Sequence, residues 1–381
     1  MRIELILSAD WELRGDGSGN MRAIQFATAD ALASLYESHG MRGTFNVEVM
    51  QQLAHLECGR RHPDLARLAV EWEAAVRTLL SRGHGIDLHV HTQWLGARYA
   101  DGRWQLGNRW SILDFTAHEA RDMIERSKTY LESVLRAVDP DYRATTFRSG
   151  TWALAPSDHL LSTLIDLGIQ VDISMVKGLV YDLDIVKLDY REVEQGFLPY
   201  YPNLRDARKV AAAPQPIVCV PTYRLPVGKG LTALRVAELP LRRALRIFSP
   251  TLYARLLKKP CDTQIPSSGY SSQASAQRWG VNRFAYALQG FRGEAIRIAD
   301  LSALSYLDMR MMMRDIRRQA RASGWDVVPI VLSNHTKDLG DLTPIRAFCR
   351  HVQGCQDVSV ITAATLAQNI AHARYPIYRA S

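Results

Sequence analysis

Two short runs of this chain place carboxylates and imidazoles at the spacing of a β-strand. Asp87 begins an Asp-Leu-His-Val-His run that contains His89 and His91, while Asp10 and Glu12 flank a tryptophan near the N-terminus. Side chains two positions apart in a strand lie on one face, so each run would project its polar groups together. Imidazoles and carboxylates that converge at strand ends can hold a divalent metal ion. The sequence therefore indicates a metallohydrolase.

Strands have to position these residues, and the chain alternates strand patterns with helix patterns. Period-2 alternation predicts strands at 3–10, 44–48, 87–91, 145–148, 170–174 and 327–333. Helical spacing and stop signals predict helices at about 23–40, 64–82, 117–137, 156–167 and 304–322. Strands that alternate with helices are typical of parallel βα units, so we expect an α/β fold built as a barrel.

The composition is that of a globular protein with a sizeable core. The chain has 381 residues, of which 47% are hydrophobic and 23% charged. It has no run of ~20 apolar residues that could span a bilayer. Its N-terminus enters a strand without the hydrophobic length of a signal peptide, so we expect a cytoplasmic protein. Its five cysteines are scattered without CxxC spacing, which argues against a disulfide framework or a thiolate zinc site.

The alternation of strands and helices breaks between residues 181 and 300. We expect 1–381 to form a single barrel domain that carries 181–300 as a large insertion. The insertion holds proline-rich turns, a basic segment at 242–259 and a polar run at 267–272. The basic segment is interpreted as an exposed amphipathic helix pair with a solvated face. An alternative is peripheral contact with an anionic membrane surface or an acidic glycan.

The net charge of +8 favours anionic partners, although it does not identify them. The sequence contains no nucleic-acid-binding motif, so we expect no nucleic-acid partner.

Four segments, in this order, resemble the polysaccharide deacetylases of carbohydrate esterase family 4. The first holds Asp10 and Glu12, and the second is the histidine run with its flanking glycines. The third, 147–152, reads Phe-Arg-Ser-Gly-Thr-Trp and is similar to the arginine motif of the family. The fourth, 332–335, reads Leu-Ser-Asn-His and is similar to its closing motif. The resemblance spans roughly residues 3–180 and 300–370. It implies a distorted, seven-stranded, TIM-like (β/α)-barrel.

The resemblance also implies roles for the catalytic residues. Asp10 would be the base that takes a proton from water, and His335 the acid that protonates the leaving amine. Arg148 would pair with Asp10 and keep it ionised and oriented. A weaker match around Asp172 lies where the family has an aspartate that tunes the site, so Asp172 would support this arrangement.

The metal ligands implied by the resemblance are Glu12 and two histidines. The first is His89. The usual second histidine lies four residues later, where this chain has Gln93. His91 is the natural substitute because it shares a strand face with His89. A glutamine oxygen remains an alternative, so the third ligand is either His91 or Gln93. Mixed nitrogen and oxygen ligands favour zinc, with cobalt and nickel as alternatives.

These roles together predict a metal-dependent hydrolase that removes an N-acyl group, acetyl or formyl, from an amino sugar. A metal ion with an open coordination position would lower the pKa of its water from 15.7 towards ~7. Without an export signal, we expect a cytoplasmic substrate. A nucleotide-linked or lipid-linked precursor of a surface glycan fits this location better than a mature polymer.

Two other functions are compatible with the same residues. The Asp-Leu-His-Val-His run also resembles the opening metal motif of phosphoesterases of the polymerase-and-histidinol-phosphatase type. In that family the motif lies on the first strand, whereas here Asp10 and Glu12 precede it. A catalytically inactive barrel that binds a glycan is the second alternative, because Trp11 and Gln93 depart from the common deacetylase pattern.

Overall fold

The computed structural model describes residues 1–226, 243–265 and 296–380. The polar run 267–272 and Arg242 of the basic segment lie outside these ranges. Among the described residues, no helix has the length and apolar character needed to cross a membrane.

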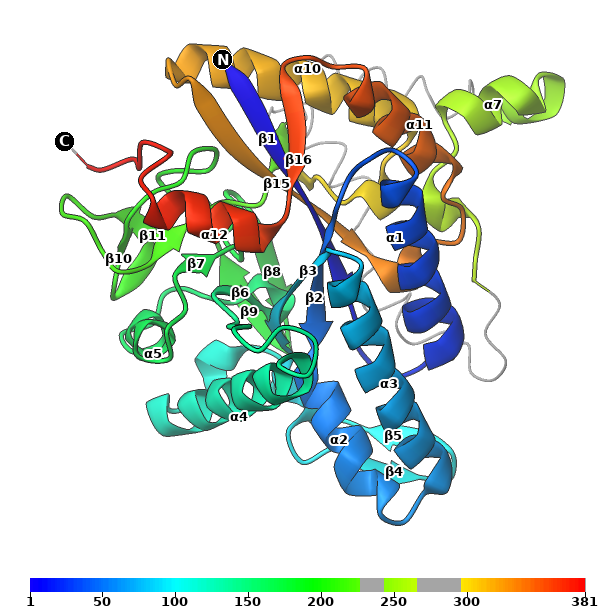
Figure 1. Ribbon diagram of the computed structural model, residues 1–381, viewed down its shortest axis with the longest axis vertical. Helices are drawn as coiled ribbons and strands as arrows, with labels where there is room; N and C mark the ends of the chain where they lie inside the picture. The colour runs from blue at the N-terminus through cyan, green and yellow to red at the C-terminus, as the bar shows by residue number, and fades with distance from the viewer. Residues whose placement is uncertain (227–242, 266–295, 381) are drawn as a thin grey trace.

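A curled sheet of parallel strands forms the centre of the molecule (Figure 1), in the order β12-β7-β6-β3-β2-β1-β15, with β16 also paired to β1. The strands are β1 (Arg2–Trp11), β2 (Thr44–Glu48), β3 (Gly85–Val90), β6 (Thr146–Ser149), β7 (Val171–Asp172), β12 (Val218–Cys219), β15 (Val327–His335) and β16 (Val358–Ile361). A parallel bridge between Thr222 and Val331 links the segment after β12 to β15, so the two edges of the sheet approach each other. The predicted α/β fold and distorted barrel are confirmed.

Helices cover the outer face of this sheet. In Figure 1, α10 and α11 lie along the upper edge, and α1 to α4 along the right and lower sides. The longer helices are α1 (Thr28–Glu37), α2 (Val49–Gly59), α3 (Pro63–Ser81), α4 (Ala117–Leu135), α5 (Leu160–Asp166), α7 (Pro250–Leu256), α10 (Tyr306–Ser323), α11 (Thr343–Gln353) and α12 (Ala363–Ala371). A π-helix, η1 (Arg22–Ala27), leads into α1.

The remaining elements are short and lie outside the central sheet. The antiparallel pairs are β4 (Arg98–Ala100) with β5 (Arg103–Gln105), β8 (Val180–Leu183) with β9 (Val186–Asp189), β10 (Pro202–Asn203) with β11 (Asp206–Val210), and β13 (Arg224–Pro226) with β14 (Ile296–Ile298). The 3-10 turns are η2 (Thr92–Trp94), η3 (Ile112–Asp114), η4 (Gly150–Trp152), η5 (Pro260–Asp262), η6 (Leu301–Ala303) and η7 (Thr336–Asp338).

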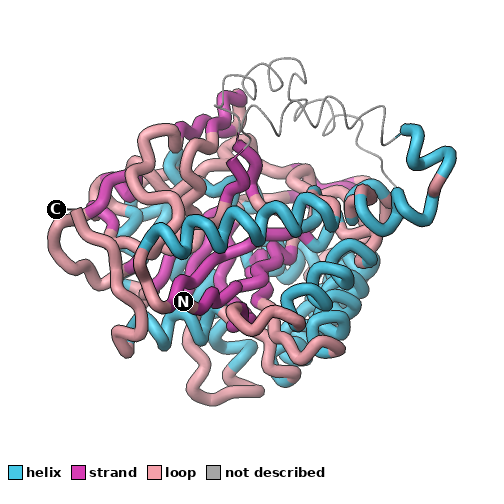
Figure 2. Tube along the Cα trace, turned by 90° about the horizontal axis from the view of Figure 1, so that it is seen from above, coloured by secondary structure: helices cyan, strands magenta, loops and turns pink. Residues whose placement is uncertain are grey.

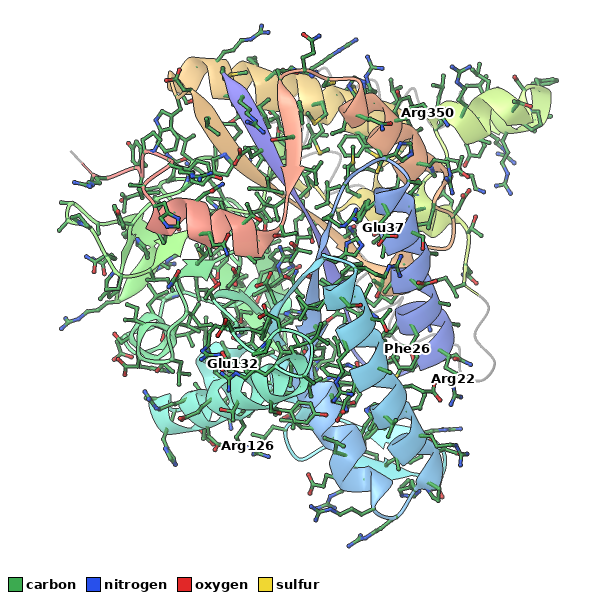
Figure 3. The ribbon with its side chains drawn as sticks, in the orientation of Figure 1. Arg22, Phe26, Glu37, Arg126, Glu132 and Arg350 are labelled. Carbon is green, nitrogen blue, oxygen red and sulfur yellow. The ribbon has the colours of Figure 1, made fainter. Side chains whose placement is uncertain are left out.

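The side chains on the two faces of β1 point into different surroundings. Its odd-numbered residues, from Ile3 to Trp11, are buried in the core between the sheet and the helices. The Trp11 ring stacks on Trp72 of α3 at a centroid distance of 5.7 Å and lies 5.8 Å from Phe26 of η1, which Figure 3 labels. Because neighbouring side chains alternate, Asp10 and Glu12 face the opposite way, into the barrel. Trp11 is therefore a core residue that separates two site residues.

Helix α12 fills the end of the barrel where the strands begin. Leu366 and Ala367 of this helix pack in one apolar cluster with Ile6, Val171 and Val331 from three barrel strands. Burial of such side chains closes the interior of the barrel at this end. The opposite end, where the strands finish, is left for a functional site.

The structure contains elements that the periodicity did not predict. Helix α2 follows directly on β2, and the chain closes with α11, β16 and α12. Strand β12 pairs with β7 in the central sheet. It lies within 181–300, so the predicted insertion contributes a strand to the barrel.

Candidate metal centre and active site

The carboxyl ends of the barrel strands bring the predicted site residues together. Parallel strands finish at the same edge of a sheet. Asp10 is in register with His335 on β15 and with Asn46 on β2, while His89 is in register with Arg148 on β6. A cavity of about 460 Å³ opens at this edge. Its lining includes Asp10, Glu12, Arg14, His89, His91, Trp110, Trp152, Tyr181, Asp300, His335 and Lys337.

Glu12, His89 and His91 form a metal-ligating group in this cavity. One ligand atom from each residue lies within 4.8 Å of the other two. Glu12 Oε2 is 3.3 Å from His89 Nε2 and 2.5 Å from His91 Nε2, and all three side chains are buried. Two imidazole nitrogens and a carboxylate oxygen suit zinc and related divalent ions, and they leave coordination positions open. The residues present therefore fit a divalent metal ion.

Hydrogen bonds turn both imidazoles so that their Nε2 atoms face Glu12. His89 Nδ1 lies 2.9 Å from the backbone oxygen of Arg148, and His91 Nδ1 lies 3.2 Å from Gln93 Oε1. An imidazole that donates from one nitrogen keeps the other free to bind a metal ion. Gln93 thus lies on the far side of the His91 ring from Glu12. This placement favours His91 over Gln93 as the third ligand.

The backbone at Gly150 packs directly against the His91 ring. A Cβ atom at Gly150 would lie 2.8 Å from His91 Nδ1, so the position has no room for a side chain. The next two residues, Thr151 and Trp152, have φ angles of 53° and 63°. Left-handed backbone costs a non-glycine residue about 1–3 kcal/mol and is concentrated at functional sites. This turn sets the Trp152 ring centroid 4.5 Å from Arg148 Cζ, at the wall of the cavity.

Lys337 is a site residue that the sequence did not indicate. Its ammonium group contacts Glu12 Oε1, while Glu12 Oε2 faces the imidazoles. Burial alone would raise the pKa of Glu12, but Lys337 and His91 together hold it well below its ordinary value. Glu12 is therefore ionised, with one oxygen paired to Lys337 and the other available as a ligand.

Asp10 is a buried carboxylate held by cationic and amide donors. Arg148 Nη1 lies 3.1 Å from Oδ1 and 3.2 Å from Oδ2, and Asn46 donates to Oδ1 at 2.7 Å. Burial raises the pKa of Asp10, but Arg148, His89 and His335 outweigh burial and lower it. Arg148 is itself fully buried. The pair therefore keeps Asp10 ionised at neutral pH and fixes its orientation.

His335 lies between two carboxylates. Its Nδ1 is 2.9 Å from Asp300 Oδ2, and its Nε2 is 3.5 Å from Asp10 Oδ2. Burial and Lys337 lower the pKa of His335, yet Asp300 and Asp10 raise it to about 9. The imidazole is therefore protonated at neutral pH, which suits a general acid. Sequence reasoning missed Asp300, because it is the last residue of the predicted insertion, where it caps η6, and no spacing links it to His335.

Replacement of Asp300 by Asn should move the alkaline limb of the pH–activity profile to lower pH. Without this carboxylate, the pKa of His335 falls, and the protonated acid is lost earlier as pH rises. If the pKa of His335 falls by about one, activity on the alkaline side falls about tenfold. The measurement is kcat/KM against pH for the wild type, Asp300→Asn and Asp300→Glu. In Asp300→Glu, the alkaline limb should return most of the way to its wild-type pH. An alkaline limb at the wild-type pH in Asp300→Asn would contradict the pairing of Asp300 with His335.

Two other interior carboxylates lie behind the site. Asp172, predicted to support catalysis, accepts hydrogen bonds from the backbone nitrogen and hydroxyl of Ser174 at 2.9 and 2.7 Å. Burial raises the pKa of Asp172 to about 7, although Ser174 and Arg148 oppose this rise. Asp87 shares a strand with His89 but stands outside the metal-ligating group. Neither carboxylate is among the residues that line the cavity.

His84 lies at the other end of β3 and has a structural role. Its Nδ1 accepts a hydrogen bond from Gly43 at 3.1 Å, and its Nε2 is 3.1 Å from Glu37 of α1, which Figure 3 labels. Burial lowers the pKa of His84, while Glu37 opposes this effect. The histidine therefore joins α1 to the start of the strand that carries the metal-ligating imidazoles.

No protein-family model matches this sequence, and no curated protein matches it. Solved structures do match. A Mycobacterium smegmatis protein assigned as a polysaccharide deacetylase has 12% identity and a TM-score of 0.51, over 100% of this chain and 94% of its own. Puue allantoinase has 12% identity and a TM-score of 0.49, over 98% of this chain and 91% of its own. A Pseudomonas aeruginosa PAO1 protein assigned as a polysaccharide deacetylase has 11% identity and a TM-score of 0.47, over 98% of this chain and 92% of its own.

These identities are too low to transfer an activity, so the likeness concerns the fold. The Mycobacterium smegmatis structure matches along nearly the full length of both chains. The order of strands and the position of the site at their carboxyl ends agree with the architecture that the motifs imply. The chain has the fold of the polysaccharide deacetylases.

Proposed function

We propose that this protein is a metal-dependent hydrolase that removes an N-acyl group from an amino sugar. The observation that carries the proposal is the content of one cavity. It holds the metal-ligating group of Glu12, His89 and His91 beside an ionised Asp10 and a protonated His335. Amide hydrolysis needs an activated water molecule, a base and an acid at one place. The shared fold with a protein assigned as a polysaccharide deacetylase supports the acyl-sugar substrate.

Glu12, His89 and His91 would hold the metal ion, for which zinc is the first candidate because the ligands mix nitrogen and oxygen. When bound, a divalent ion would polarise the acyl carbonyl and make a water molecule more acidic. The buried acceptor oxygens behind both imidazoles fix their orientation before any ion binds. A site arranged in advance loses little orientational freedom on metal binding.

Asp10 and His335 would move the protons of the reaction. Asp10 takes a proton from the attacking water, and Arg148 keeps this carboxylate ionised until then. His335 donates its proton to the amide nitrogen as the C–N bond breaks, with Asp300 stabilising the cationic imidazole beforehand. The products are a free amine and a carboxylate. Asp10 Oδ2 lies 3.5 Å from His335 Nε2. After the products leave, Asp10 can therefore return its proton to His335.

The walls of the cavity suit a sugar with an anionic substituent. Trp110, Trp152 and Tyr181 offer aromatic faces, against which sugar rings pack. Arg14 also lines the cavity, and within the described residues it has no carboxylate partner. A free guanidinium binds phosphate or carboxylate groups. This supports a phosphate-bearing substrate, such as a nucleotide-linked or lipid-linked precursor of a surface glycan.

The two alternatives are less well supported. The phosphoesterases named above use several metal ions, whereas the described residues contain one metal-ligating group of this kind. An inactive glycan-binding barrel would not need a complete acid, base and ligand set, and all of these groups converge here.

Metal removal and reloading test the proposal. The purified protein would be stripped with a chelator, reloaded with zinc, cobalt or nickel, and incubated with N-acetylated and N-formylated amino sugars in free, oligomeric, nucleotide-linked and lipid-linked forms. We expect acetate or formate release that the chelator abolishes and one of these metals restores. Release of inorganic phosphate from phosphomonoesters, without acyl release, would support the phosphoesterase instead. Tight glycan binding with neither product would support the inactive barrel.

A further inference from the structure

The described part of the basic segment stands away from the body of the molecule. Residues 243–248 are helical, and α7 follows after a break at Ser249. Figure 1 shows α7 at the periphery, beyond α11, and Figure 2 shows this helical segment projecting at one edge of the molecule. Its inner end is anchored, because Leu257 is buried and Lys258 Nζ lies 2.6 Å from Asp341 Oδ2. Helix α7 also contacts α10 and α11, so one side of the segment rests on the body and the other side faces outward.

Large apolar side chains are gathered on this projection. Ile247, Phe248 and Leu252 have 65%, 84% and 40% of their surface exposed. Phe248 is the most exposed large hydrophobic side chain among the described residues. Single exposed apolar residues are ordinary, but a cluster marks a contact with a membrane or another molecule. Nothing in the fold of the described chain explains why this cluster faces water.

Cations surround the apolar cluster, and carboxylates are absent from it. From residue 243 to residue 260 the sequence has five lysines and arginines and no aspartate or glutamate. Lys258 is used in the ion pair with Asp341. Arg243, Arg246 and Arg255 have no carboxylate partner within the described residues. A surface of this kind carries positive charge that its own fold does not neutralise.

We propose that residues 243–256 form a docking surface for an anionic lipid membrane. A bilayer interface takes up exposed apolar side chains below its headgroups and attracts arginines to its phosphates. A convex projection reaches a flat surface without steric hindrance, whereas it offers no groove to a peptide. The two helical pieces present apolar side chains and arginines within a short stretch of chain. Their anchored end joins this surface to the barrel.

The docking surface is connected to the candidate site. Segment 243–256 leads into η5, which contacts η6, and η6 is capped by Asp300 beside His335. Membrane binding would therefore hold the cavity near the bilayer. The proposal stands on exposure and charge alone, so it holds whether or not the protein is a deacetylase.

Vesicle flotation tests the proposal directly. The full chain would be mixed with vesicles of phosphatidylcholine alone, or of phosphatidylcholine with an equal amount of phosphatidylglycerol, and floated through a density gradient. We expect flotation with the anionic vesicles only, and release as salt screens the charges. Failure of the wild type to float with anionic vesicles overturns the proposal and leaves an acidic protein or a nucleic acid as the partner to examine.

Two double variants separate the charge from the apolar cluster. Arg243→Gln with Arg246→Gln should weaken partitioning roughly thirtyfold, because each arginine near an anionic surface contributes about fivefold. Ile247→Ser with Phe248→Ser should weaken it by about tenfold or more.

The matched control changes one arginine and one exposed hydrophobic on α3, Arg67→Gln with Val70→Ser, where Val70 is 69% exposed. The control should bind vesicles like the wild type. Thermal denaturation would show that all four proteins are folded. Wild-type partitioning in either segment variant, or an equal loss in the control, overturns the proposal.

Discussion

Replacement of Asp10 by Asn should lower kcat/KM for acyl release by about 10²- to 10⁴-fold, the contribution expected of a positioned general base. The amide has the shape of the carboxylate but cannot take a proton from water at neutral pH. Asp10 lies outside the metal-ligating group, so zinc binding should persist. The measurements are steady-state kinetics of acetate release and calorimetric titration with zinc on the same preparation.

Asp172→Asn is the matched control for this prediction. Asp172 is also fully buried, and Arg148 lowers the pKa of both carboxyl groups. It bonds to Ser174 and stands outside the lining of the cavity. We therefore expect a much smaller loss of activity than in Asp10→Asn. If the two variants lost activity equally, the effect would come from a disturbed interior rather than from a missing base.

The fold could be predicted where the chain repeats a simple period. Strand β2 spans Thr44–Glu48, which is the predicted range. Helix α3 spans Pro63–Ser81, so each of its ends lies one residue from the prediction. Strand β12 was missed because two paired residues among proline-rich turns carry no periodic signal. Helix α12 was missed although it fills the barrel, because its apolar side chains face an interior that only the closed sheet creates.

The site could be predicted where its residues stand on strand ends. Asp10, Glu12 and His89 lie at the ends of β1 and β3, and alternation alone assigns them to one face. Asp300 caps η6 and Lys337 lies in η7, and no period relates these two residues to their partners. Contacts of this kind depend on how separate loops meet after the barrel closes.

The same reasoning explains the ambiguity over the third ligand. His91 follows the end of β3, and Gln93 lies in η2, so strand alternation stops between the two residues. From the sequence, either side chain could reach the metal ion. The structure resolves their relation through a contact: the Gln93 amide lies against His91 Nδ1, and His91 Nε2 lies against Glu12.

Replacement of His91 by Ala should therefore weaken zinc binding far more than replacement of Gln93. Loss of a residue that orients a ligand typically costs ten- to hundredfold in metal affinity, which we expect for Gln93→Ala. Loss of the ligand itself should exceed this range and abolish measurable acyl release. The affinities would be measured by competition with a zinc chelator, with thermal denaturation to show that each variant is folded.

His159→Ala is the matched control, because it removes a partly exposed imidazole that contacts Asp158 and stands outside the ligand set. Its zinc affinity should equal that of the wild type. Anomalous diffraction at the zinc edge would add a direct readout, with a peak bounded by Glu12, His89 and His91. The reverse order of effects, with Gln93→Ala more damaging than His91→Ala, would make the glutamine oxygen the third ligand. The Gln93–His91 hydrogen bond would then have to break when the metal ion binds, because the amide would need to turn towards Glu12.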